Sequence, residues 1–228
     1  MHIAEGFLPP LHAAAWTAVS LPFVAFSAWR VNRLMRERPE TKLLLAASGA
    51  FAFLLSALKL PSVTGSSSHA TGVGLGTVLF GPSAMAFLGA IVLAFQALLL
   101  AHGGLTTLGA NVFAMAVVGP WVACALVRGG RWLGAPLSAS VLAAAVSANL
   151  ATYLTTAGQL ALAFPDPASG VAGSFLKFAG VFAPTQLPLA VVEGLLTVSA
   201  VNFLREYGGD EPQALAFSAK SRAVEIPR

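Results

Sequence analysis

Long apolar stretches separated by short polar ones dominate the pattern of this chain. Between Leu43 and Val127 the only formal charge is Lys59, and between Trp132 and Leu176 it is Asp166. Apolar runs of this length are typical of membrane-spanning helices. The alternating pattern of barrel strands is absent, and a helix satisfies its own backbone hydrogen bonds inside a bilayer. The pattern therefore predicts an all-α polytopic membrane protein.

Breaks in the apolar pattern place the expected helices. We expect them at residues 11–31, 43–60, 67–80, 83–101, 112–127, 136–164 and 184–204, with a loop at 165–177. The third of these begins at a run of serines, which favour helix starts. Its apolar part, residues 73–80, is too short to cross about 30 Å. We therefore expect this helix to cross a thin or invaginated part of the protein.

Basic residues at the ends of these segments orient the chain. The densest cluster follows the first segment and consists of Arg30, Arg33, Arg36, Arg38 and Lys42. The positive-inside rule makes this cluster cytoplasmic and the N-terminus external. Seven crossings also place Arg128, Arg131 and Arg205 inside, whereas six would leave the first two outside. We expect seven helices in one membrane-embedded domain, residues 1–204, and a polar cytoplasmic tail at 205–228.

Composition excludes several classes of function. The 228 residues are 57% hydrophobic and 10% charged, against about 25% charged in soluble domains. The net charge of +4 comes from segment ends, so it gives no reason to expect nucleic acid. The single Cys124 excludes an internal disulfide and a thiolate cluster. No GxxxxGK[ST], HExxH or CxxC motif and no Ser-His-Asp layout occurs, so we expect a non-enzymatic chain without its own ATPase site.

The N-terminal stretch MHIAEGFLP carries the first candidate chemistry. It lacks the charged and apolar regions of a signal peptide, so we expect a free amine on Met1 ahead of His2. That amine, the His2 backbone nitrogen and His2 Nδ1 can close two chelate rings on one ion. Such a nitrogen set suits square-planar binding of a late transition metal, with an imidazole as the natural fourth ligand. The alternative is an ordinary solvated terminus.

The predicted topology places His2, His12, His69 and His102 at the outer side. His69 lies in SSSHATG, where hydroxyls and backbone amides can orient its second ring nitrogen. We therefore pair His2 with His69 as metal ligands, the alternative for His69 being a hydrogen-bonded loop residue. His12 is expected to be an interfacial histidine.

Other polar residues are candidates for support of the metal. His102, Asn111 and Ser68 are candidates for contact with the ligands; the alternative for His102 is to end a helix, and that for Asn111 is to form a turn. Glu193 is an intramembrane carboxylate, a type of residue that is often functional. It lies near mid-helix, far from the outer face, so a protonated or hydrogen-bonded helix–helix contact is at least as strong an alternative. Glu5 is expected to attract cations or to cap the N-terminal segment, not to bind the metal directly.

Four blocks of the sequence resemble CbiM, the cobalt-capturing membrane component of energy-coupling factor (ECF) transporters, and its nickel relative NikM. They are MHIAEGFLP, KLPSVTGSSSHATGVGLGTVLFGP, MAFLGAIVLAFQALLLAHGGLTTLGAN and PLAVVEGLLTV. The resemblance implies seven helices and a square-planar site formed by Met1, His2 and His69. The chain departs from the usual sequence motif of the cobalt branch at Ala70, where proline is frequent in that branch.

The resemblance also implies a function and partners. We expect a component of an ATP-driven importer in the cell inner membrane that captures Co²⁺ for cobalamin biosynthesis, with Ni²⁺ as the alternative substrate. The expected partners are the coupling subunit CbiQ, the ATPase CbiO, the small membrane protein CbiN and the lipid bilayer. A membrane scaffold without a ligand and an intramembrane enzyme are the alternatives from other classes.

Overall fold

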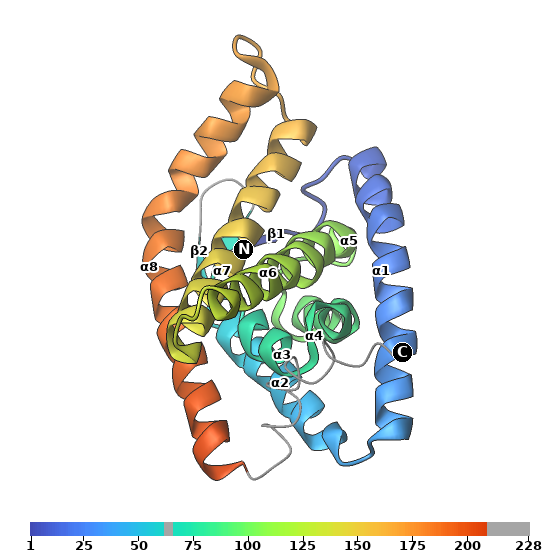
Figure 1. Cartoon of the computed structure of the whole chain (residues 1–228). Coiled ribbons are helices and arrows are strands. Elements are labelled where there is room, and N and C mark those ends of the chain that lie inside the picture. The colour runs from blue at the N-terminus through green and yellow to red at the C-terminus, as the bar shows by residue number, and fades with distance from the viewer. Residues whose placement is uncertain (62–65, 209–228) are drawn as a thin grey trace, which may run out of the picture.

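The computed structural model describes residues 1–61 and 66–208, and most of them are helical (Figure 1). The helices are α1 (Pro10–Glu37), α2 (Thr41–Ala57), α3 (Val73–Phe80), α4 (Pro82–Leu100), α5 (Leu108–Asn111), the π-helix η1 (Val112–Val118), α6 (Gly119–Trp132), α7 (Leu137–Ala163) and α8 (Gly170–Tyr207). The strands are β1 (His2–Ile3), β2 (Leu60–Pro61) and β3 (Ser66–Ser68).

The expectation of a helical, multi-pass membrane protein is confirmed. Five helical stretches in the described residues are long and apolar enough to cross a membrane: α1, α4, the run Leu108–Trp132, α7 and α8. Helix α2 is also apolar, but it has 17 residues and falls short of that length. Large hydrophobic side chains on these helices are exposed, among them Leu98, Leu99 and Trp132. Such surfaces are stable in lipid, where apolar exposure carries no penalty.

The third expected helix, 67–80, is wrong in its N-terminal half. Ser66–Ser68 form strand β3, which lies between β1 and β2 in an antiparallel sheet. Backbone groups that pair on both sides of a strand are unavailable to a helix. Helix α3 therefore begins only at Val73 and is eight residues long, about 12 Å.

The last helix is longer than predicted. The expected loop at 165–177 is mostly helical, because α8 begins at Gly170 and runs through Pro184 and Pro188 to Tyr207. Each proline removes one helical hydrogen bond, but α8 packs along α7 and continues past both (Figure 1). Residues 205–207 of the expected tail belong to this helix. Gly208 follows the helix, and residues 209–228 of that tail lie outside the described residues.

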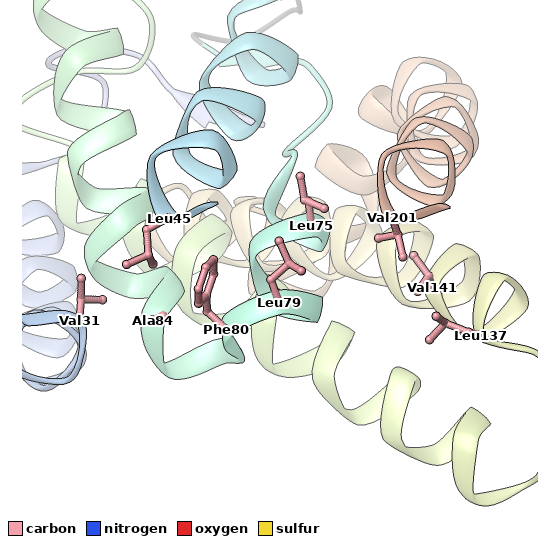
Figure 2. Packing of buried hydrophobic residues seen from close by; sticks show 9 residues of the cluster. All are labelled: Val31, Leu45, Leu75, Leu79, Phe80, Ala84, Leu137, Val141 and Val201. Atoms are coloured by element: carbon pink, nitrogen blue, oxygen red, sulfur yellow. The ribbon is translucent and has the colours of Figure 1, made fainter. Parts of the chain in front are cut away.

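A hydrophobic cluster around α3 joins the helices into one core (Figure 2). Leu75, Leu79 and Phe80 of α3 belong to one cluster with residues from five other helices. The other buried members are Val31 of α1, Leu45 of α2, Ala84 of α4, Leu137 and Val141 of α7, and Val201 of α8. The short helix is thus an interior element, which explains why it can be apolar and yet too short to span.

A second cluster buries the start of the chain. Met1 and Ile3 have no exposed surface, and Leu8 has 4%. They pack with Ala110 and Phe182, among others, from α5 and α8. In Figure 1 the N-terminus lies within the outline of the bundle, beside α7. The first residues therefore form part of the core and are fixed in place by it.

Candidate metal centre

The N-terminal strand is held by side chains that lie about a hundred residues away in sequence. The backbone N–H of Ile3 donates to Asn111 Oδ1 at 2.8 Å. The carbonyl of Ile3 accepts from Asn111 Nδ2 at 3.1 Å and from Thr107 Oγ1 at 2.8 Å. On the other side of the strand, His2 lies opposite Ser67 in β3. These contacts fix the backbone on both sides of His2.

Glu5 anchors the next residues to the loop before α5. Its carboxylate accepts from the Thr106 backbone N–H at 3.3 Å, and the Gly6 N–H donates to Thr106 Oγ1 at 2.9 Å. The hydrogen bonds from Thr106 lower the pKa of Glu5 below its ordinary value. Glu5 thus bonds the N-terminal segment to this loop, which is closer to the expected capping role than to the attraction of cations.

Three buried histidine rings meet beside this strand. The ring centroids of His2 and His69 are 4.1 Å apart, and those of His102 lie 4.6 Å from His2 and 4.7 Å from His69. One nitrogen from each ring lies within 4.8 Å of the others. All three side chains are at most 1% exposed. His12, at the start of α1, is not part of this group.

Hydrogen bonds determine the tautomers of His2 and His69. His2 Nε2 donates to the thioether sulfur of Met115 at 3.3 Å, and His69 Nδ1 donates to the carbonyl of Ala70 at 2.7 Å. A neutral imidazole has one proton, so His2 Nδ1 and His69 Nε2 carry free lone pairs. Both atoms are buried without a hydrogen-bond partner in the described part of the chain. Buried nitrogens in this state are suited to bind a metal ion.

His102 joins the site through a strained turn. Ala101 ends α4 in the left-handed conformation, with φ 46°, and the Lys59 ammonium donates to the carbonyls of Leu100 and Ala101. A left-handed alanine is energetically costly, and such residues concentrate at functional sites. His102 Nε2 lies 2.8 Å from Ser67 Oγ, and its Nδ1 has no partner in the described residues. His102 therefore both follows a helix end and belongs to the cluster.

Two of the serines in β3 have different roles. Ser67 contacts His102, and the sequence offered no signal for it beyond its neighbours. Ser68, the serine singled out from the sequence, accepts from Thr185 Oγ1 at 2.8 Å and so ties β3 to α8. Asn111 acts through the backbone of Ile3. Ser68 and Asn111 thus bond the strands beside the cluster, and no hydrogen bond from either side chain to an imidazole occurs in the described part of the chain.

The nitrogen atoms of this site are neutral near pH 7. Burial lowers the pKa of the Met1 amine to about 5, although the charge of Glu193 opposes this shift. Burial, followed by the neighbouring His69 and the terminal amine, holds the pKa of His2 well below its ordinary value. Burial likewise lowers the pKa of His69, and that of His102 to about 3. Because these nitrogens are already neutral, protons do not compete with a late transition metal for their lone pairs.

Comparison with known proteins decides the family. Residues 2–211 match the model of CbiM, described as "Cobalt uptake substrate-specific transmembrane region". The chain belongs to the CbiM family. The Cobalt transport protein CbiM 2 of Pelobacter propionicus is 54% identical over 225 residues, covering 99% of this chain and 100% of that protein. The Cobalt transport protein CbiM of Streptomyces coelicolor is 61% identical over 204 residues, covering 90% of this chain and 88% of that one.

Solved structures show the same architecture. A truncated transition metal transporter superposes with a TM-score of 0.79 at 29% identity, covering 91% of this chain and 99% of that one. A second transition metal transporter gives a TM-score of 0.77 at 28% identity, covering 97% and 100%. This CbiM-family chain is therefore a multi-pass membrane component of metal uptake.

The sequence led us to expect Glu193 far from the candidate ligands. In this CbiM-family fold it instead lies close to one of them. Its carboxylate accepts from the backbone N–H groups of Thr71 and Gly72, both at 2.7 Å. These residues follow His69 and Ala70 in the turn that leads into α3. Because α3 is only eight residues long, this turn lies deep in the bundle, next to the middle of α8. Glu193 therefore contacts the turn that carries a candidate ligand.

Proposed function

We propose that this chain is the substrate-binding membrane component of an ATP-driven ECF importer that brings Co²⁺ into the cell for cobalamin synthesis. One observation carries this proposal. His2 Nδ1 and His69 Nε2 are buried, unprotonated and without a hydrogen-bond partner among residues 1–61 and 66–208, and they meet beside a buried N-terminal strand. The membership of the chain in a family of cobalt uptake proteins supports the same substrate.

The arrangement supports a set of four nitrogen ligands. Met1 supplies the terminal amine, His2 supplies its backbone nitrogen and Nδ1, and His69 supplies Nε2. The two chelate rings of the first residues impose a planar arrangement, and the imidazole of His69 closes it. The tautomers of both histidines support this ligand set, because each leaves the required nitrogen without a proton.

His102, Asn111 and Ser68 support the site from outside. His102 covers the other two imidazoles, Asn111 holds the strand that carries His2, and Ser68 fastens β3 to α8. Partners of this kind keep ligands oriented before the metal arrives, which raises affinity.

The chain would cross the membrane seven times, with its N-terminus outside and its C-terminus in the cytoplasm. The basic residues at the C-terminal ends of α1 and α6 and at Arg205 in α8 support this orientation. In this arrangement residues 1–204 capture the metal and residues 205–228 face the cytoplasm. Helix α3 and strand β3 together would form the third of these seven crossings.

Transport would require other subunits. The sequence contains no P-loop motif, so ATP hydrolysis falls to an ATPase such as CbiO. CbiQ would couple that ATPase to this chain, and CbiN would act as the accessory membrane protein. No part in nucleic-acid binding is proposed.

Nickel is the second candidate substrate. A planar set of four nitrogens suits Ni²⁺, and the Irving–Williams order predicts that Ni²⁺ binds at least as tightly as Co²⁺. Affinity alone therefore does not separate the two metals. The two metals are separated by measuring how much of each is accumulated by cells that express the complete transporter, with both metals at limiting concentrations.

The terminal amine provides the decisive test. Purified protein that begins at Met1 is compared with a variant extended by three residues before Met1, with Co²⁺ binding followed by absorption and the fold followed by circular dichroism. We expect saturable binding by the first, none by the extended variant, and the same helical spectrum for both. A His69→Ala variant should also lose binding. Equal binding by the extended variant would exclude the amine as a ligand, and normal binding by His69→Ala would exclude the site.

A further inference from the structure

The carboxylate of Glu193 is surrounded by donors. Besides the N–H groups of Thr71 and Gly72, it accepts from the Thr71 hydroxyl at 2.5 Å and from Asn149 Nδ2 at 2.6 Å. Hydrogen bonds this short are typical of an ionised acceptor. Four donors converge on this fully buried carboxylate, at the end of the turn that follows His69, and such donors favour its ionised form.

No second acidic side chain is buried in the described part of the chain. Among residues 1–61 and 66–208, Glu193 is the only buried carboxylate. No salt bridge to it occurs in the described residues, whose two ion pairs, Arg33–Glu37 and Asp166–Lys177, lie elsewhere. A buried charge without a counter-charge is costly. An ionised Glu193 therefore requires a positive partner close by.

The metal ion supplies that partner. A divalent ion bound by one deprotonated amide and three neutral nitrogens retains one net positive charge. A single carboxylate balances it. Glu193 is joined to the site through the turn after His69, since it accepts from the backbone N–H groups of Thr71 and Gly72.

We infer that Glu193 is the counter-charge of the metal site and the positioning residue of the His69 turn. This role presupposes the four-nitrogen site proposed above. Glu193 holds Thr71 and Gly72, and so sets the direction in which the chain leaves His69. At the same time it neutralises the complex in a medium where charge is poorly screened.

Four variants separate charge from packing. Glu193→Gln removes the charge and keeps the size of the side chain. Asn149→Ala removes a hydrogen bond between α7 and α8 but leaves the carboxylate. Thr197→Val alters the same helix one turn later, where the Thr197 hydroxyl has no partner in the described residues. The double variant Glu193→Gln/Asn149→Asp returns one carboxylate to the same cluster from the facing helix.

The measurement is a Co²⁺ titration of each full-length variant, with the absorption band of the bound metal recorded at saturation and the melting temperature recorded without metal. We expect Glu193→Gln to lose about 10- to 100-fold in affinity, the range for groups that support metal ligands, with an unchanged band. Asn149→Ala should lose stability but much less affinity, and Thr197→Val, which removes a hydroxyl without a partner in the described residues, should change neither appreciably. The double variant should recover affinity, and it carries the test if Glu193→Gln does not fold.

Each outcome is informative. Wild-type affinity in Glu193→Gln, or a loss no larger than in Asn149→Ala at the same loss of stability, overturns the role of Glu193 while the site stands. Failure of the double variant to recover affinity overturns the charge balance. A wild-type protein without saturable binding, or a His69→Ala variant with normal binding, overturns the proposed function itself.

Discussion

The side chain of Asn111 holds both backbone polar groups of Ile3, accepting from its N–H at 2.8 Å and donating to its carbonyl at 3.1 Å. A carboxamide that makes both bonds takes the place of a neighbouring strand. It gives the short strand β1 a partner on the side opposite β3. His2, the residue before Ile3, is thereby fixed in the absence of metal.

Replacement of this carboxamide should weaken metal binding through the strand. We expect Asn111→Ala to lower Co²⁺ affinity by about 10- to 100-fold, because the residues that carry the amine and His2 become free to move. Asn202→Ala serves as the control, since Asn202 is exposed on α8 and bonds only Ser138 in the described residues. Titration of both variants measures the effect. Equal affinity for Asn111→Ala and wild type would show that β3 alone holds the strand.

His69 and His102 should differ in kind. We expect His69→Ala to abolish saturable Co²⁺ binding, because it removes a proposed ligand. His102→Ala should retain binding with affinity reduced by about 10- to 100-fold, because it removes a group that supports the ligands. The absorption band of bound Co²⁺ should persist only in His102→Ala. The reverse pattern would make His102 the fourth ligand.

The lowered pKa values predict how many protons binding releases. The folded amine, with a pKa of about 5 against 8.0 for an ordinary terminus, is already neutral at pH 7. His2 and His69 are neutral too, because burial lowers their pKa values. Only the amide proton of His2 then remains to be released.

We therefore expect about one proton released per Co²⁺ at pH 7 and about two below pH 5, where the amine must also lose its proton. The affinity for Co²⁺ should accordingly increase with pH over the whole range, and its dependence on pH should be steeper below pH 5. Calorimetric titration in buffers of different ionisation enthalpy counts the protons. Two protons at pH 7 would mean that the amine keeps its ordinary pKa.

Gly72 should resist replacement for two reasons. Its φ of +68° is unfavourable for other residues, and an added Cβ would lie 2.6 Å from the Cα of Ala52 in α2. We expect Gly72→Ala to lower the melting temperature and to weaken metal binding, because the Thr71–Gly72 turn leads from His69 to α3. Gly49→Ala is the matched control, since an added Cβ there meets nothing within 4 Å. It should be neutral or slightly stabilising, as alanine favours helices by about 1 kcal/mol. Similar melting temperatures for the two variants would contradict the predicted strain.

The sequence alone determined the helical membrane class, because the absence of charge over long stretches is a local property that leaves few other folds. It placed the fourth and sixth helices, now α4 and α7, within one residue at each end. It also pointed to Met1, His2 and His69, since neighbouring nitrogens that form chelate rings can be recognised within two residues. That ligand set stays a prediction.

Only the tertiary structure decided the features that depend on distant pairing. Ser66–Ser68 form a strand because β1 and β2 lie on either side of them, and α8 continues through Pro184 because α7 packs along it. The same pairing brought His102 against the other histidines and Glu193 against the turn after His69. Local propensity is silent on such contacts, since residues a hundred positions apart meet only when the whole chain has folded.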